Sequence, residues 1–128
     1  MTRARIVVAD DHELMREQVA RLLKREFDVI AAVADGKALL EAAARLKPDV
    51  CVIDISMPIF NGIEAAGHLK QSESPAKVIF LTIHDDSDFV SAAFKSGAEG
   101  YVFKSRMGAD LVVAVREVLA GRTFLSSS

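Results

Sequence analysis

A continuous apolar segment that ends in a carboxylate, residues 50–54, constrains the fold of this chain more than any other feature. Its first four residues are Val-Cys-Val-Ile, without polar residues in alternate positions, and Asp54 follows directly. Such a run is typical of a strand covered on both faces, as in parallel sheets. A turn containing Pro58 and Asn61-Gly62 comes next. Because ligands bind beyond the carboxyl ends of parallel strands, Asp54 is expected at such a position.

Apolar strands alternate with amphipathic helices along the whole chain. Strands are predicted at residues 5–9, 27–33, 50–53, 77–81 and 99–103, and helices at residues 12–27, 38–46, 63–71, 87–95 and 108–120. In the first helix the helical spacing places one apolar face at Leu14, Met15, Val19, Leu22 and Leu23. Five strands alternating with five helices predict an α/β fold, a doubly wound five-stranded parallel sheet with helices on both faces.

The composition is that of a single globular domain. The chain has 128 residues, of which 51% are hydrophobic and 27% charged, and this suits one compact core. We expect a domain at residues 1–121 and a short tail at residues 122–128. The net charge of −2 gives no basic face for nucleic acid. Cys51 is the only cysteine and is expected to be a small buried residue. Without a signal peptide or a bilayer-spanning segment, a cytoplasmic location and no membrane partner are expected.

Polar residues recur where the predicted strands end. Asp10 and Asp11 follow the first strand, Asp54 the third, Thr82 the fourth and Lys104 the fifth. The carboxyl ends of parallel strands lie along one edge of a sheet. Three carboxylates, a hydroxyl and an ammonium group are therefore expected in one shallow crevice.

Carboxylates crowded in this way repel one another, which predicts either protonation or a bound cation. Two charges about 4 Å apart interact by roughly 4 kcal/mol at the effective dielectric of a protein surface. Mg²⁺ suits the site because it prefers oxygen ligands and binds through carboxylates together with phosphate oxygens. Lys104 and Thr82 would complete a phosphate site, where Asp54 could attack phosphorus and form an aspartyl phosphate.

Several of these residues also have ordinary structural explanations. Asp54 can simply end its strand, and Thr82 can be a common strand-end residue. Asp10 with Glu13 fits a capping box at the start of the first helix. His12 and His68 are expected on helix faces, without the spacing of metal ligands.

The complete set of residues resembles the receiver domain of two-component response regulators. The resemblance comprises Asp10-Asp11, Asp54 with Met57-Pro58 and Gly62, Thr82, and Tyr101 three residues before Lys104. Asp-Asp-His-Glu at 10–13, Leu-Thr-Ile-His-Asp-Asp at 81–86 and Gly-Tyr-Val-Phe-Lys at 100–104 are most similar to the NarL/FixJ branch, which has a LuxR-type output. The resemblance covers nearly the whole chain and implies a flavodoxin-like (βα)5 sheet with strand order 2-1-3-4-5.

The resemblance also implies a role for each residue. Asp54 would be the phosphoacceptor, and Lys104 and Thr82 would bind the phosphoryl group. The Mg²⁺ ligands would be Asp11, Asp10, Asp54 and the backbone carbonyl of Ser56. Thr82 and Tyr101 would form a conformational switch. Ser56 and His84, two residues after Asp54 and Thr82, would flank the phosphoryl group, and we predict from these positions that they tune its hydrolysis, although His84 can also be an ordinary polar loop residue. The donor would be a phosphohistidine on a sensor histidine kinase.

Two features of the chain differ from the pattern of this branch. Lys104 is followed by Ser105, where many receivers have a proline after a cis bond. The branch normally continues through a linker into a helix-turn-helix domain, so the chain is expected to be either a receiver fragment or a stand-alone receiver. Binding to DNA would need that output domain, and phosphorylation would favour a homodimer. The receiver itself is not expected to be an enzyme with turnover.

Other functions of the same fold compete with this one. A Mg²⁺-dependent phosphohydrolase usually has a second aspartate two residues after the nucleophile, where this chain has Ser56. A flavin-binding module would need a hydroxyl-rich first loop, and this loop is Asp-Asp-His-Glu. A phosphorylation-independent adaptor or stand-alone interaction module would tolerate the loss of Asp54.

Overall fold

The computed structural model describes residues 3–57 and 61–127, so the predicted turn at Pro58 lies outside the described residues. In these residues the strands are β1 (Arg5–Ala9), β2 (Asp28–Val33), β3 (Val50–Ile53), β4 (Lys77–Thr82), β5 (Gly100–Phe103) and β6 (Phe124–Leu125). The helices are α1 (Glu13–Lys24), α2 (Gly36–Leu46), α3 (Gly62–Gln71), α4 (Ser87–Lys95) and α5 (Met107–Leu119), with the 3₁₀ turn η1 (Lys104–Arg106) before α5. Each predicted strand and helix is present, with its ends shifted by a few residues.

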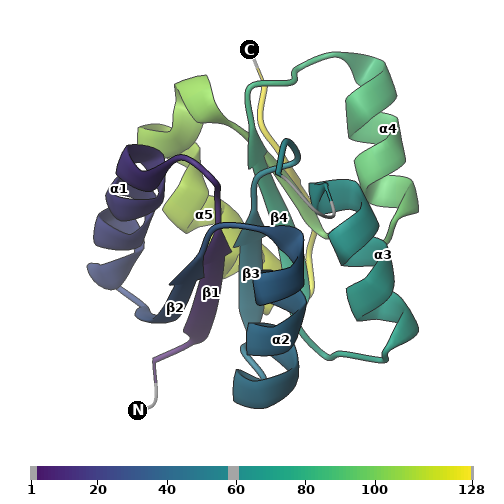
Figure 1. The fold of residues 1–128 in the computed structure, drawn as a ribbon. Coiled ribbons are helices and arrows are strands. Elements are labelled where there is room, and N and C mark those ends of the chain that lie inside the picture. Colours follow the sequence, from purple (N-terminus) through teal and green to yellow (C-terminus); the bar gives the residue numbers. More distant parts are fainter. Residues whose placement is uncertain (1–2, 58–60, 128) are drawn as a thin grey trace.

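The strands form one parallel sheet in the order β2-β1-β3-β4-β5-β6 (Figure 1). The predicted doubly wound, flavodoxin-like order 2-1-3-4-5 is confirmed. The prediction of five strands is wrong by one, because β6 adds a further strand beside β5. Two residues are too few to produce a periodic apolar pattern, so the sequence places residues 124–125 in the tail.

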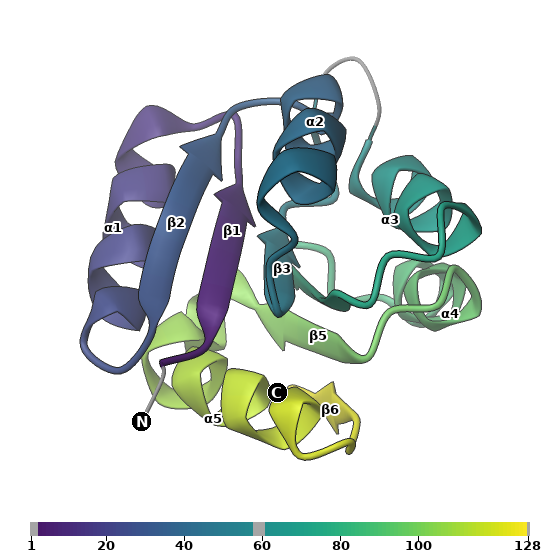
Figure 2. The same cartoon turned by 90° about the horizontal axis from the view of Figure 1, so that it is seen from below.

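Helices cover both faces of the sheet, as Figure 2 shows: α1 and α5 lie on one side, and α2, α3 and α4 on the other. The four residues of β3 divide between the two resulting cores. Val50 and Val52 pack with residues of α1 and α5, whereas Cys51 and Ile53 pack with residues of α2 and α3. This burial on both faces explains the absence of polar alternation in the strand. Among the described residues, no helix combines the length and apolarity needed to cross a membrane.

Cys51 is fully buried, as predicted. Burial raises the pKa of its thiol to about 12, so that the thiol remains protonated and unreactive at neutral pH.

The predicted apolar face of the first helix is correct except at its start. Val19 and Leu23 are fully buried, whereas the side chain of Leu14 is 75% exposed. Leu14 is the second residue of α1, close to the carboxyl edge of the sheet, where the core has ended. Periodicity identifies the face of a helix but does not show where its neighbours stop.

The segment after α5 is held against β5 mainly by polar contacts. The N–H of Phe124 donates to the carbonyl of Glu99 (3.0 Å), and the N–H of Ser126 donates to the carbonyl of Tyr101 (2.9 Å). The buried Ser126 hydroxyl donates to Asp110 Oδ2 at 2.7 Å and accepts from the N–H of Phe103 at 3.2 Å. Hydrogen bonds rather than an apolar pattern therefore fix the position of this segment.

Two glycines of α3 are expected to respond in opposite ways to alanine. A Cβ on Gly62 would lie 2.5 Å from the carbonyl oxygen of Asp54 and 2.8 Å from Cα of Ile55, both backbone atoms, whereas a Cβ on Gly67 would meet nothing within 4 Å. Gly62→Ala should lower the free energy of unfolding by about 1–3 kcal/mol, as overpacking does. Gly67→Ala should raise it by about 0.5–1 kcal/mol through helix propensity. Urea denaturation of both variants measures this, and a stable Gly62→Ala protein would contradict the close approach.

Candidate functional site

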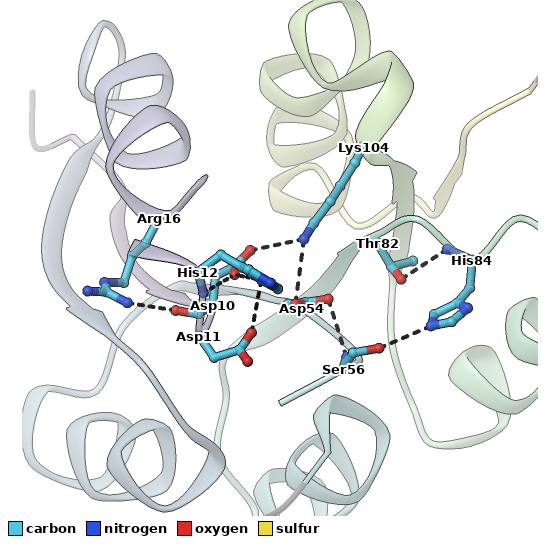
Figure 3. A network of polar contacts seen from close by, with 9 residues as sticks. All are labelled: Asp10, Asp11, His12, Arg16, Asp54, Ser56, Thr82, His84 and Lys104. Carbon is cyan, nitrogen blue, oxygen red and sulfur yellow. Dashed lines mark hydrogen bonds and ion pairs between the residues drawn. The ribbon is translucent and has the colours of Figure 1, made fainter. Parts of the chain in front are cut away.

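The polar residues that follow the strands meet at the carboxyl edge of the sheet, as predicted (Figure 3). Asp10 follows β1, Asp54 follows β3 and Lys104 follows β5. The Lys104 Nζ lies 3.2 Å from Asp10 Oδ2 and 3.5 Å from Asp54 Oδ2. Asp10 is 2% exposed and Asp54 is 4% exposed. One ammonium group thus bridges two buried carboxylates that belong to different strands.

Some neighbours of Asp54 raise the pKa of its carboxyl group and others lower it. Burial raises the pKa of Asp54 above its ordinary value, Lys104 lowers it, and Asp10 raises it again by like-charge repulsion. The net direction is upward, because desolvation disfavours the charged form. The ionised side chain is therefore held in an unfavourable environment that a cation can improve.

Asp10 does not cap the first helix, and the predicted capping box with Glu13 is wrong. The residue that precedes α1 as its N-cap is His12, which makes no side-chain capping bond. The Asp10 Oδ1 accepts from the N–H of His12 at 2.9 Å, and the Asp10 carbonyl accepts from Arg16 Nη1 at 2.9 Å. The carboxylate of Asp10 is thereby turned toward Lys104 and the centre of the site.

His12 also belongs to the site, which contradicts its predicted place on a helix face without metal spacing. Its Nδ1 lies 3.4 Å from Asp10 Oδ1 and 3.2 Å from Asp11 Oδ1. One ligand atom from each of Asp10, Asp11, His12 and Asp54 lies within 4.8 Å of the others. The sequence feature that could have indicated this role is the position of His12, which directly follows an aspartate pair at a strand end. This donor set can hold a divalent cation.

On the other side of Asp54, Thr82 at the end of β4 and the loop residues Ser56 and His84 form a connected group. The Ser56 N–H donates to Asp54 Oδ1 at 3.3 Å, and the Ser56 Oγ lies 3.1 Å from His84 Nε2. The fully buried Thr82 accepts at Oγ1 from the N–H of His84 at 3.2 Å. The imidazole of His84 stacks on the ring of Phe89, at the start of α4, with 4.0 Å between centroids.

Tyr101, which the resemblance names as a switch residue, lies deep in the protein. The side chain is fully buried between Phe80 and Phe103, in edge-to-face contacts with both rings. Its hydroxyl donates to the carbonyl of His84 at 2.6 Å, and burial raises the pKa of Tyr101 to about 12. His84 is therefore bonded to Tyr101 through its carbonyl and to Ser56 through its ring.

A hollow of about 450 Å³ gives access to the site. It is lined by His12, Leu14, Met15, Gln18, Asp54, Ser56, Ile83 and Lys104. Leu14 and Ile83 stand at its rim with 75% and 74% of their surfaces exposed. No sequence pattern indicates this apolar rim. Asp54 is thus buried among its neighbours yet faces an open space large enough for a phosphorylated group.

Residues 6–116 match the family model described as the response regulator receiver domain. The chain belongs to this receiver-domain family. The receiver is 41% identical over 122 residues to the transcriptional regulatory protein DegU of Brevibacillus brevis, covering 94% of this chain and 52% of DegU. It is 34% identical over 124 residues to the oxygen regulatory protein NreC of Staphylococcus epidermidis, covering 94% of this chain and 57% of NreC. The receiver thus spans about half the length of the curated relatives it matches.

The fold of the receiver is similar to that of a solved two-component response regulator of the LuxR family from Aurantimonas sp. SI85-9A1. The TM-score is 0.93 and the identity 38%, with 98% of this chain and 91% of that chain covered. Together these relatives confirm the predicted NarL/FixJ type. The Lys104–Ser105 peptide bond of this receiver is trans.

Removing the charge of Asp54 is expected to stabilise the folded receiver. A carboxyl whose pKa is raised on folding binds protons more readily in the folded than in the unfolded state, so its contribution to stability falls as pH rises. In metal-free buffer at neutral pH, Asp54→Asn should raise Tm by a few degrees, where about 4 °C corresponds to about 1 kcal/mol. The difference should vanish in acid, below about pH 4. Asp85→Asn, at an exposed position of the loop after β4, is the control in the same thermal melts. A lower Tm for Asp54→Asn would contradict the unfavourable burial.

Proposed function

We propose that this receiver accepts a phosphoryl group on Asp54 from a phosphohistidine of a sensor histidine kinase, in a reaction that requires Mg²⁺. The observation that supports the proposal most is the position of Asp54. Its carboxylate is 4% exposed and lies 3.5 Å from Lys104 Nζ, yet it lines the hollow that opens to solvent. An ion pair with only a structural role would not have to line a hollow that is open to solvent.

In the proposed transfer an Asp54 oxygen attacks phosphorus as the ionised carboxylate, so no base is needed. The oxygen–phosphorus bond forms while the phosphorus–nitrogen bond to the kinase imidazole breaks, and the electron pair stays on that nitrogen. The ammonium of Lys104 would donate to the phosphoryl oxygens. The Thr82 Oγ1 accepts from the N–H of His84, which leaves its own hydroxyl hydrogen for a phosphoryl oxygen.

The residues present fit a hard divalent cation. Asp10, Asp11 and Asp54 carry three negative charges, and Lys104 compensates one of them at 3.2 and 3.5 Å. One divalent ion would balance the remainder. Asp11, Asp10, Asp54 and the backbone carbonyl of Ser56 would hold it through oxygen atoms, as Mg²⁺ prefers. When bound, Mg²⁺ supplies positive charge that offsets the incoming phosphoryl group.

We further propose that Thr82 and Tyr101 link the phosphoryl group to a two-state equilibrium. Thr82 would turn toward the phosphoryl group and carry the backbone of His84 with it. Because the Tyr101 hydroxyl donates to the carbonyl of His84, the buried position of Tyr101 depends on where this loop lies. Phosphorylation would then increase the population of the buried arrangement rather than create it.

The role of the whole protein follows from its relatives as a proposal. DegU carries the name of a transcriptional regulatory protein, and this chain covers 52% of it. We propose that the receiver controls transcription in the cytoplasm through a DNA-binding domain that is not part of residues 1–128, with a homodimer favoured by phosphorylation. The receiver would catalyse only its own phosphorylation and dephosphorylation and would not act as an enzyme with turnover.

The phosphorylation proposal predicts a covalent adduct. Incubation with acetyl phosphate and Mg²⁺ should add one phosphoryl group by intact mass, and Asp54→Asn or chelation of the metal should abolish it. Lys104→Gln should slow the reaction by about 10²-fold, as the loss of one electrostatic stabiliser does. Asp85→Asn should react like the unaltered protein. No adduct under any condition would refute the switch and favour a phosphorylation-independent adaptor of the same fold.

The contact between Ser56 and His84 predicts an effect on the lifetime of the phosphoryl group. The bonded pair lies beside Asp54, with the imidazole fixed by Phe89, and would screen the phosphoryl group from water. Ser56→Ala combined with His84→Ala should shorten the half-life about fivefold, since loss of about 1 kcal/mol corresponds to such a factor. Decay of the adduct is followed by intact mass, with His68→Ala as the control. An unchanged half-life in a double variant that is phosphorylated at the normal rate would contradict the screening.

A further inference from the structure

His12 stands at the mouth of the acidic cluster, and its side chain is 70% exposed. Its backbone position is set by two bonds: its N–H donates to Asp10 Oδ1 at 2.9 Å, and its carbonyl accepts from the N–H of Arg16 at 2.9 Å. Although His12 is the N-cap of α1, its ring makes no capping bond. In Figure 3 the ring instead extends over the site, toward the space between Asp11 and Asp54.

The spacing of the donor atoms matches ligands that share one ion. Metal–ligand distances of about 2.1 Å place neighbouring ligands of an octahedral ion about 3.0 Å apart. The His12 Nδ1 lies 3.2 Å from Asp11 Oδ1 and 3.4 Å from Asp10 Oδ1. With one Asp54 oxygen, all four donor atoms lie within 4.8 Å of one another. An imidazole nitrogen and carboxylate oxygens therefore converge without any change of the backbone.

We propose that His12 is a nitrogen ligand of the divalent cation site, and that it gives this receiver an added affinity for first-row transition ions such as Mn²⁺, Co²⁺ and Ni²⁺. Imidazole suits transition ions, whereas Mg²⁺ prefers oxygen ligands and retains its water. The inference rests on the proposed function only because the two share the carboxylates of Asp10, Asp11 and Asp54. Mg²⁺ would bind through oxygen atoms alone, and a transition ion would bind through the carboxylates and His12.

The test compares the two classes of ion in the receiver without a polyhistidine tag. Dissociation constants for Ni²⁺ alone and Mg²⁺ alone are measured by calorimetry at about pH 8, because metal ligands bind in their deprotonated form. His12→Ala is expected to weaken Ni²⁺ binding about tenfold or more and to leave Mg²⁺ binding within about twofold. His68→Ala is the matched control and should leave the Ni²⁺ affinity unchanged.

A spectroscopic measurement identifies the ligand independently of affinity. With histidine labelled by ¹⁵N, pulsed electron paramagnetic resonance of bound Mn²⁺ should show one coupled nitrogen, which is lost in His12→Ala. Persistence of the coupling in His12→Ala, or equal weakening of Ni²⁺ and Mg²⁺ binding, would overturn the inference. An unchanged Ni²⁺ affinity would do the same and would mean that His12 only pairs with the carboxylates. Asp11→Ala separates the two proposals: Mg²⁺ binding that survives it would refute the metal site of the proposed function itself.

Discussion

The arrangement of the site depends on the ammonium group of Lys104, which lies between the buried carboxylates of Asp10 and Asp54 at 3.2 and 3.5 Å. Removing Lys104 would leave both carboxylates without compensation, and breaking a buried ion pair in this way typically costs about 3–5 kcal/mol. Lys104 neutralises only part of the negative charge, since Asp11 lies in the same cluster. An excess of negative charge therefore remains near Asp54, and this excess would attract a cation.

The parallel topology explains why so much of the site could be predicted from sequence. The apolar run of β3 and the alternation of strands and helices indicate a doubly wound sheet, which places every strand end on one edge. Asp54, Thr82 and Lys104 follow their strands directly, so that their convergence required only the topology and no knowledge of side-chain packing. The structure brings all of them to this edge, as predicted.

The features that the sequence did not predict depend on interactions that leave no periodic pattern. The backbone position of His12 is set by its bonds with Asp10 and Arg16, and sequence spacing carries no information about the bond to Asp10. The strand β6 is held by the buried hydroxyl of Ser126, which contacts Asp110 on α5, and an isolated serine gives no signal in a polar tail. The exposure of Leu14 reflects where the neighbouring elements end. Local bonds thus decided the position of His12, whereas tertiary contacts between segments distant in sequence, or their absence, decided the other two.

Tyr101 connects the site to the edge of the sheet through two separate groups. Its hydroxyl donates to the carbonyl of His84, and its own carbonyl accepts from the N–H of Ser126. One contact uses the side chain and the other the backbone, so the ring movement of the proposed switch would not separate β6 from β5. The movement would cost one hydrogen bond, about 1 kcal/mol net, together with the burial of the ring. The helix beside it is weakly anchored, since Ala93 is the only residue of α4 that is fully covered. Phe89, whose ring stacks on His84, belongs to this helix, so the switch proposed above would act on α4 before it acts on the sheet.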